Sequence, residues 1–430
     1  MVINITDSSI DKLHAFVEQH LPPKKIERKM FGEVFTPLSL VDEMLTAVEK
    51  YGDKNIWNNP KLKILDPAAG IGNFPLIAYQ KLMKGLKHIP KYKDEECRRK
   101  HILENMLYMI ELNPTNARLM KKIFGGRKYK LNIVKGDALD NKTHKQLLSL
   151  TGEKELKFDI IMGNPPYNDD KGIAGGGNNL YQKFVGFGLN HLTPNGVLTM
   201  ITPAGILKTT DYEEETFFMT AVKNMTISYI NINECEKHFP NIGSNFVYYV
   251  ISNKKSHFIK ASTSKVKTVI VNSKNINIKD LRWIPIIASN TCINIIKKCS
   301  LHTFNFKRND SMTDFNRKVF MKRLNHLNYN NPSMFPKHDF DNKNRNTGVM
   351  LYHDVNSIKE AEFMCSILDS NLFKFINIVS RFDAVIYHKL LNQFGIPKTN
   401  TSKRLRSADV YELYGLTMEE IKLIESVISS

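Results

Sequence analysis

The stretch "ILDPAAGIGNF", residues 64–74, contains a short apolar run, an acidic residue and two closely spaced glycines. The apolar run predicts a strand that ends at Asp66, and the glycines, Gly70 and Gly72, predict a tight turn before a helix. Open α/β sheets bind nucleotide-like ligands at the carboxyl ends of their strands, where glycine lets the backbone approach the ligand closely. We therefore expect a ligand site at this turn.

The residue types in the turn narrow the choice of ligand. The spacing differs from the GxGxxG dinucleotide motif, and no Gly-Lys-Ser/Thr follows that would make a Walker A loop. Asp66 places a carboxylate at the turn, which repels a pyrophosphate but suits an ammonium group or hydroxyls. This pattern favours S-adenosylmethionine over NAD.

Around this turn, short apolar runs alternate with helical patterns from residue 60 to 252, as expected for a parallel sheet covered by helices. The expected strands cover residues 63–65, 108–110, 132–134, 158–162, 196–201, 227–232 and 246–251. The expected helices cover residues 38–51, 75–87, 114–124 and 181–192. The charged segment 84–100 is expected to form an elongated helix or a surface insertion, and a capping box from Thr417 to Glu420 predicts a closing helix.

Two further acidic residues follow the next two expected strands. Glu111, in "YMIELNP" (residues 108–114), is placed to accept hydrogen bonds from ribose hydroxyls. Asp137, in "VKGDALD" (residues 134–140), is placed to meet an adenine amino group. Either acid alone would more often be a solvated loop carboxylate, but three acids after successive strands indicate one binding site.

The stretch "MGNPPYND", residues 162–169, places an amide, two prolines and an aromatic ring after another expected strand. The exocyclic amine of adenine is a poor nucleophile, and two acceptors on its N–H bonds, the Asn164 side-chain oxygen and the Pro165 carbonyl, would localise its lone pair. Pro165 and Pro166 stiffen the loop that holds these acceptors. Tyr167 offers a face on which a flipped-out base can stack. A turn that only capped the strand would need neither the amide nor the ring.

These motifs, with "FGEVFTP" at residues 31–37, occur in an order that resembles the gamma group of amino-group DNA methyltransferases, specifically the N6-adenine enzymes. The resemblance spans residues 31–252. It implies an α/β, seven-stranded S-adenosylmethionine-dependent methyltransferase fold with a C-terminal target-recognition domain, and it implies that Thr36 contacts the methionine carboxylate of the cofactor. The implied cofactor-binding residues are Phe35, Thr36, Asp66, Ala68, Gly70, Gly72, Glu111, Leu112, Asp137, Ala138 and Asn164. The NPPY motif alone also occurs in enzymes that methylate glutamine or RNA.

The resemblance also implies a second aromatic residue that covers the far face of the flipped base. Tyr249 in "GSNFVYYVI" (residues 243–251) is our first choice, with Tyr248 and Phe246 as alternatives. A strand aromatic in the core is an equally good interpretation of Tyr249. The glycine-rich run "GIAGGGNN", residues 172–179, predicts either a flap that orders over substrate or a linker.

The net charge of +18 is concentrated in residues 251–340, the basic segment, which holds 17 Lys and Arg against 4 Asp and Glu. This concentration favours a nucleic-acid surface over a codon bias, which would spread along the chain. The candidate phosphate contacts are Lys254, Lys255, Arg308, Arg317, Lys318, Lys322 and Arg323. The interleaved Phe304, Phe306, Phe315 and Phe320 are expected in a core. We expect an N-terminal extension (1–30), a catalytic domain (31–252) and a basic DNA target-recognition domain (253–430).

Other features exclude some classes of protein. No stretch approaches the length of a membrane span, and the polar start lacks a signal-peptide pattern, so a cytoplasmic protein is expected. The five cysteines are scattered without a CxxC pair, which fits neither a disulfide framework nor a zinc site, and we expect them to be small core residues.

The expected function is S-adenosylmethionine-dependent N6-methylation of adenine in double-stranded DNA, within a restriction-modification, phage-defence or viral system. A cognate restriction endonuclease or another defence subunit is the expected partner. The alternatives are methylation of RNA or of a protein glutamine, and a non-catalytic DNA-binding subunit on the same scaffold. Intact Asn164, Tyr167 and Thr36 argue against the last, because a decayed site has no need for them.

Overall fold

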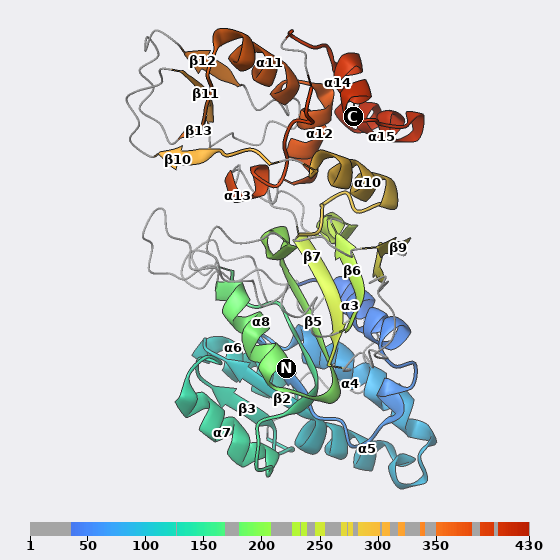
Figure 1. Cartoon of the computed structure of the whole chain (residues 1–430). Coiled ribbons are helices and arrows are strands. Elements are labelled where there is room, and N and C mark those ends of the chain that lie inside the picture. The colour runs from blue at the N-terminus through green and yellow to red at the C-terminus, as the bar shows by residue number, and fades with distance from the viewer. Residues whose placement is uncertain are drawn as a thin grey trace. The chain divides into compact units, whose positions relative to one another are not determined.

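The computed structural model divides the chain into two compact units, residues 1–206 with 216–263 and 269–273, and residues 207–215 with 264–268 and 274–430. Each unit is described by itself (Figure 1). The structure describes residues 36–125, 127–167, 180–207, 226–232, 234–238, 246–253, 268–272, 274–277, 283–301, 303–309, 317–322, 336–339, 350–380, 388–399 and 403–429. The expected domain limits at residues 30 and 252 stay predictions.

The first unit contains a mixed sheet whose first seven strands have the order β3-β2-β1-β4-β5-β7-β6. These strands are β1 (Ile64–Asp66), β2 (Leu107–Glu111), β3 (Asn132–Lys135), β4 (Phe158–Gly163), β5 (Leu192–Pro203), β6 (Thr226–Ile232) and β7 (Phe246–Ser252). All seven expected strands are confirmed, and so is the seven-stranded methyltransferase fold. β7 departs from the expected parallel arrangement because it pairs antiparallel with both β5 and β6. A further strand, β8 (Thr268–Val271), pairs in parallel with β6.

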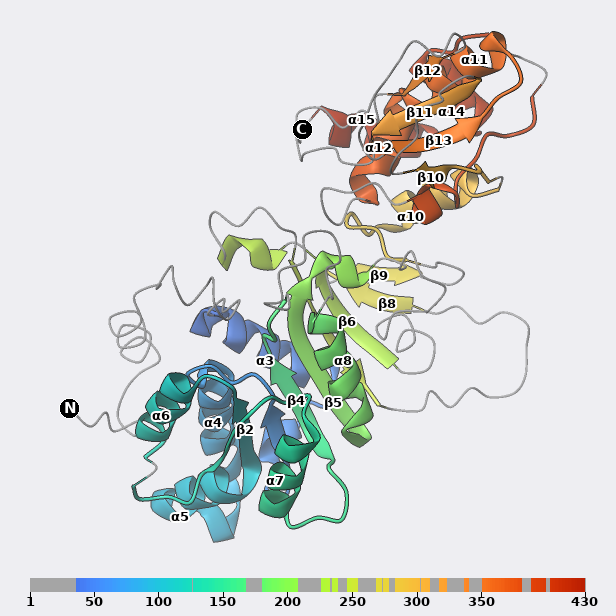
Figure 2. The ribbon, with the colours of Figure 1, turned by 90° about the vertical axis from the view of Figure 1, so that its left-hand side faces the viewer.

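Helices cover both faces of this sheet. The four expected helices are confirmed as α3 (Leu38–Tyr51), α4 (Asn73–Gly85), α6 (Pro114–Ile123) and α8 (Leu180–Asn190). α6 begins at Pro114 and is capped by the Asn113 side chain, which accepts from the Thr115 amide. A further helix, α7 (Asn141–Thr151), packs with α8 on one face through His144 and Phe187 (Figure 2).

The charged segment 84–100 is an insertion of short helical turns. It contains the turns Leu86–His88 and Pro90–Tyr92 and the helix α5 (Glu95–His101). Arg99 pairs with Glu95 and Glu96 on the exposed side of α5. The strands β1 and β2 are buried along their whole length and are mostly apolar up to their acidic last residues, Asp66 and Glu111, which is typical of parallel strands covered on both faces.

The second unit contains a four-stranded antiparallel sheet with the order β10-β13-β11-β12. The strands of this sheet are β10 (Lys307–Asn309), β11 (Lys318–Lys322), β12 (Lys337–Asp339) and β13 (Met350–Asp354). The second unit also contains the strand β9 (Lys274–Asn277), which does not belong to this sheet. Its helices are α10 (Asn290–Cys299), α11 (Ile358–Leu368), α12 (Asn371–Val379), α13 (His388–Leu391), α14 (Ser407–Leu413) and α15 (Met418–Ile428). α15 opens with the predicted capping box between Thr417 and Glu420.

Aromatic residues of the basic segment lie in the core of this unit. Phe304, Phe306 and Phe320 are buried, as expected, whereas Phe315 lies outside the described residues.

The expectation that the cysteines are core residues was wrong in part. Cys235, Cys292 and Cys299 are buried, but Cys365 is half-buried. Cys97 is exposed because α5 turns it towards solvent.

Within the described ranges, no helix is both long and apolar enough to cross a membrane.

Candidate active site

Asp66 ends β1 with its carboxyl group buried in the first unit. The residue is 0% exposed, and its Oδ1 accepts a hydrogen bond from the Ala68 amide at 3.0 Å. Oδ2 is buried and, within the described residues, has no hydrogen-bond partner. Burial, with a smaller contribution from the charge of Glu111, raises the pKa of Asp66 to about 8. A ligand cation at Oδ2 would stabilise the ionised form.

The glycine turn after Asp66 is held by Glu111, the last residue of β2. The Gly70 amide donates to Glu111 Oε2 at 2.6 Å, and the Asn113 amide donates to Glu111 Oε1 at 2.6 Å. Gly70 has φ +57°, and apart from its chain neighbours no atom of the described residues lies within 4 Å of the position of a Cβ, so these residues leave the space above the turn open. At Gly72, with φ +97°, a Cβ would lie 2.6 Å from the Phe124 ring, so glycine lets the start of α4 pack closely.

The ends of β2 and β3 place an exposed apolar side chain close to an exposed acid. The Gly136 amide donates to the Glu111 carbonyl oxygen at 3.1 Å and joins the two strand ends. Leu112 is 58% exposed, which is unusual for a leucine that follows a buried strand. Asp137 is exposed and accepts from the Leu139 amide at 2.9 Å, while Ala138 is buried. An apolar surface beside a carboxylate suits the ring and the amino group of an adenine.

Gly163, which sequence analysis missed, allows β4 to end against Asp66. β1 and β4 are parallel neighbours, and a Cβ at Gly163 would lie 2.8 Å from Asp66 Oδ1. A larger residue would therefore displace the Asp66 carboxyl group or the following Asn164. A glycine directly before the Asn-Pro-Pro sequence is the feature that could have indicated this close approach.

Asn164 is held by Thr36, which lies far away in the sequence. The Asn164 side-chain amide donates from Nδ2 to Thr36 Oγ1 at 3.0 Å. Thr36 is itself buried, and its carbonyl oxygen accepts from Asn73 Nδ2 at 2.8 Å. Sequence analysis did not predict the role of Asn73 at the start of α4. The structure thus joins the segment before α3, the start of α4 and the end of β4.

Tyr167 lies in an aromatic cluster beyond the two prolines. Its ring is half-buried and packs against Phe246 at a centroid distance of 5.7 Å and against Tyr181 at 6.5 Å. Burial of the hydroxyl raises the pKa of Tyr167, so this group stays neutral. The Tyr167 carbonyl oxygen accepts from the Leu180 amide at 3.2 Å. The residues between these two positions, including the expected flap at 172–179, lie outside the described residues.

The three candidates for the second aromatic differ in position. Tyr249, the first choice, is 0% exposed in the middle of β7, and its role in stacking stays a prediction. Tyr248 donates from its hydroxyl to Glu43 Oε1 at 2.9 Å and thus points towards α3. Phe246, at the start of β7, is the candidate whose ring packs against Tyr167.

Several predicted residues cannot be placed in this way. Phe35, Lys254, Lys255 and Arg323 lie outside the described residues, as do the side chains of Arg308 and Lys322. Arg317 is exposed in the turn before β11, with φ 51°. Lys318 is 17% exposed and pairs from Nζ with Asp354 Oδ1 at 3.3 Å. Within the described ranges, no group of three His, Cys, Asp or Glu side chains could hold a metal ion.

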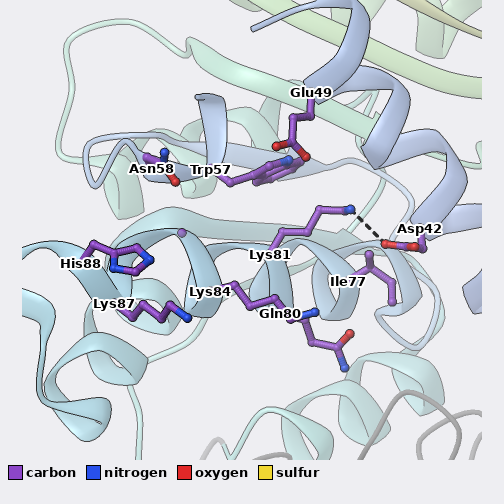
Figure 3. Close-up of a pocket in the computed structure, with 11 residues that line it drawn as sticks. Asp42, Glu49, Trp57, Asn58, Ile77, Gln80, Lys81, Lys84, Lys87 and His88 are labelled. Atoms are coloured by element: carbon purple, nitrogen blue, oxygen red, sulfur yellow. Dashed lines mark ion pairs between the residues drawn. The ribbon is translucent and has the colours of Figure 1, made fainter. Parts of the chain in front are cut away.

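A separate cavity of about 460 Å³ lies along α3 and the second half of α4. Its lining includes Trp57, Lys84 and Lys81, and Lys81 Nζ pairs with Asp42 Oδ1 at 2.9 Å (Figure 3). None of the predicted site residues lines it. Because the glycine turn precedes the start of α4, this cavity is distinct from the candidate active site.

Comparisons with known proteins identify the family of this chain. A family model described as N-6 DNA methylase matches residues 17–282. A curated relative, an uncharacterized adenine-specific methylase of Mycoplasma pneumoniae, is 28% identical, and the match covers 42% of this chain and 57% of the relative. The chain thus spans little more than half the length of that relative.

The solved structures that are similar to this chain include two restriction-modification proteins. The type IIL restriction-modification enzyme MmeI, solved in complex with DNA, matches with a TM-score of 0.53 and 12% identity over 99% of this chain and 78% of that chain. A type I restriction-modification methyltransferase subunit from Streptococcus thermophilus matches with a TM-score of 0.38 and 17% identity over 58% of this chain and 51% of that chain. The likeness to MmeI supports the fold.

Proposed function

The chain belongs to the N-6 DNA methylase family, and from that premise we propose that it transfers a methyl group from S-adenosylmethionine to the exocyclic amine of a flipped-out adenine in double-stranded DNA. The observation that carries this proposal is the convergence of two polar groups at adjacent strand ends. Asp66 offers a buried carboxyl group for a ligand cation, and Asn164, next to Gly163, offers an amide acceptor for a planar amine.

The described residues fit this cofactor. The buried Asp66 Oδ2 would hold the ammonium group, and the open space above Gly70 would take the ribose beside Glu111. Glu111 accepts the Gly70 amide at Oε2 and the Asn113 amide at Oε1, and a carboxylate of this kind can also accept a hydrogen bond from a ribose hydroxyl. Leu112 would pack on the adenine ring, and the Asp137 carboxylate would accept a hydrogen bond from the adenine amino group. When bound, the cofactor supplies an electrophilic methyl group on a sulfonium.

The residues around Asn164 would activate the target amine without a covalent intermediate. Asn164 Oδ1 and the Pro165 carbonyl oxygen would each accept a hydrogen bond from one N–H of the amine, which localises the nitrogen lone pair for attack on the methyl carbon. The S–CH3 bond would break as the N–CH3 bond forms, the sulfur would leave as a neutral thioether, and the methylated nitrogen would lose one proton to water. Pro165 is buried and Pro166 follows it, so the loop is held before substrate arrives. Tyr167 would stack on the base, with Tyr249 as the predicted partner on the other face and Phe246 as the residue that supports the Tyr167 ring.

The basic segment would contact DNA phosphates. MmeI, whose fold this chain shares, is a restriction-modification enzyme and was solved with DNA. We include in the proposal a place in such a system, with a restriction endonuclease or another defence subunit as the partner. Binding of DNA by this segment would be mainly electrostatic, because the phosphate backbone carries the dominant charge.

The decisive experiment incubates the full chain with labelled S-adenosylmethionine and separate DNA, RNA and protein substrates, followed by nucleoside and amino-acid analysis. We expect N6-methyladenine in double-stranded DNA. Methylated RNA or methylglutamine alone would favour the alternative enzymes, which also present a planar amine. Cofactor binding or DNA binding without any methylated product would favour a non-catalytic subunit.

A further inference from the structure

Thr36 contacts Asn73 through its carbonyl oxygen and Asn164 through its hydroxyl. Thr36 is fixed by Asn73, which donates from Nδ2 to the Thr36 carbonyl oxygen at 2.8 Å. Its Oγ1 accepts from Asn164 Nδ2 at 3.0 Å. A hydroxyl has one donor hydrogen and two acceptor lone pairs, so this contact leaves the hydrogen available. Among the described residues, the structure gives the hydrogen of Thr36 Oγ1 no acceptor, which points to an acceptor on a ligand.

The use of that hydrogen limits which side of the Asn164 amide can face Thr36. A free hydroxyl can accept from the NH2 of an amide or donate to its oxygen, so by itself it does not select an orientation. Once the hydrogen is donated to a ligand, Thr36 Oγ1 can only accept. The NH2 of Asn164 must then face Thr36, and Oδ1 faces the other way, where the target amine needs an acceptor.

The ligand group that receives this hydrogen can be identified from its neighbours. Asp66 lies beside Gly163, and Gly163 precedes Asn164, so Thr36 and Asp66 belong to one site. If Asp66 holds the ammonium group of the cofactor, the carboxylate on the same carbon atom must lie close by. A carboxylate is an acceptor only, and it forms a stronger, charge-assisted hydrogen bond with a hydroxyl.

We propose that Thr36 is a positioning residue that couples binding of the cofactor carboxylate to the productive orientation of the Asn164 amide. This inference rests on the proposed function, because it assumes S-adenosylmethionine at Asp66. Binding of the cofactor would then prepare the acceptor for the target amine before DNA arrives. Donation from the Asn164 NH2 polarises the Thr36 hydroxyl and strengthens the hydrogen bond that this hydroxyl gives to the carboxylate, so removal of the Asn164 amide should weaken that bond.

The first test measures cofactor binding by calorimetry and needs no methyl transfer. The probes are S-adenosylmethionine and its decarboxylated analogue, and the variants are Thr36→Val, Thr36→Ser and Thr46→Val. Thr46 is a control because its Oγ1 accepts from Lys81 on the exposed side of α3, away from the site. Wild type, Thr36→Ser and Thr46→Val should prefer the carboxylate-bearing cofactor by about tenfold or more, the value of one charge-assisted hydrogen bond. Thr36→Val should lose most of this preference.

Asn164→Ala then tests the coupling. In this variant, the ratio of the affinities for S-adenosylmethionine and its decarboxylated analogue should fall by about two- to threefold. The double variant Thr36→Val/Asn164→Ala should show the same ratio as Thr36→Val alone. A preference in Asn164→Ala equal to wild type would overturn the proposal, because it would show that Thr36 meets the carboxylate independently of the amide. Equal affinities of wild type for the two cofactors would overturn it as well.

Single-turnover methylation at saturating cofactor gives a second test. Wild type should react more slowly with the decarboxylated analogue, whereas Thr36→Val should be slow with both cofactors and Thr36→Ser should behave as wild type. Equal wild-type rates with the two cofactors would contradict the positioning role. Failure to methylate any substrate would overturn the proposed function, and the calorimetric coupling would still decide the role of Thr36.

Discussion

One acidic side chain of each unit, Asp66 in the first and Asp354 in the second, shows an opposite arrangement. In the first unit, Asp66 is buried, and within the described residues one of its oxygens has no hydrogen-bond partner. In the second unit, the Asp354 side chain is 54% exposed and pairs with both Lys307 and Lys318. A buried acid without a partner is costly, whereas an exposed ion pair contributes about 0–1 kcal/mol. The first arrangement is expected where a ligand supplies the missing partner, so function should be sensitive there.

Asn164→Ala should have the largest effect on the reaction. The amide oxygen would matter mainly as charge develops on the target amine, and groups of this kind typically contribute about 3 kcal/mol, or 10²- to 10³-fold in rate. Affinity for S-adenosylmethionine should change by about threefold at most, as argued above for its coupling to Thr36. The measurement is single-turnover methylation of duplex DNA beside calorimetry. Asn105→Ala is the matched control, since that amide is exposed and, in the described part of the chain, donates to the His101 carbonyl oxygen of its own helical segment. A rate equal to wild type would remove Asn164 from the mechanism.

Gly163→Ala should lower both stability and cofactor affinity. The new Cβ would lie 2.8 Å from Asp66 Oδ1, so the strand end or the carboxyl group must move. Overpacking of this kind costs about 1–3 kcal/mol. Gly152→Ala is the informative control, because Gly152 has φ +67° but no atom within 4 Å of a Cβ. It should reduce thermal stability and leave cofactor affinity intact. If the two variants bind cofactor equally well, the close approach at Gly163 has no functional role.

Asp66→Asn should change how stability depends on pH. The pKa of Asp66 is about 8 in the folded chain and near 3.8 when unfolded, so the folded chain binds more protons between pH 4 and 8. The free energy of unfolding should therefore fall as pH rises through that window. The free energy of unfolding of the variant should not decline in this window. At pH 8 it should exceed that of wild type by at least about 1.4 kcal/mol, which corresponds to one pKa unit. Denaturant titrations at several pH values measure it, and parallel curves for the two proteins would contradict the burial argument.

The same substitution should reduce cofactor affinity and abolish linked proton release. At pH 7 a largely protonated Asp66 must ionise to hold an ammonium group, so wild type should release a proton on binding. Calorimetry in buffers of different ionisation enthalpy measures this release. Proton release by Asp66→Asn equal to that of wild type would assign the titration to another group.

Glu111→Ala should also weaken cofactor binding, because it removes the carboxylate that holds the Gly70 amide.

The sequence predicts those parts of the fold that depend on local pattern. The strands were found because their apolar runs are continuous, and α3 because its apolar face repeats along its whole length. The antiparallel direction of β7 was missed, since a buried apolar strand looks the same in either direction. α7 was missed because "NKTHKQLLSLT" is mostly polar and buries only Thr143, Leu147 and Thr151.

The candidate site also contains some residues that the sequence predicts and others that it does not. The residues in motifs at strand ends, such as Asp66 and Asn164, could be named from the sequence because parallel strands share one carboxyl edge. Gly163 and Asn73 could not, since their roles depend on distances between segments that only the folded chain brings together. Nor does the sequence show that Tyr249 is buried in mid-strand while Phe246 packs against Tyr167.

The smallest expected effect concerns two adjacent cations of the basic segment, Arg317 and Lys318. Arg317 is exposed, and among the described residues no ion pair involves it, whereas Lys318 pairs with Asp354. If Arg317 contacts a phosphate, Arg317→Ala should flatten the log-log salt dependence of duplex binding by about 0.9. Lys318→Ala should flatten it less, because part of its charge is already compensated by Asp354. Both variants should weaken the binding of all DNA sequences about equally, since phosphate contacts carry no sequence information.

The measurement is a salt titration of duplex binding for both variants and wild type. Slopes equal to wild type for Arg317→Ala would place the DNA surface elsewhere, and a larger change for Lys318→Ala would show that DNA displaces Asp354 from the pair.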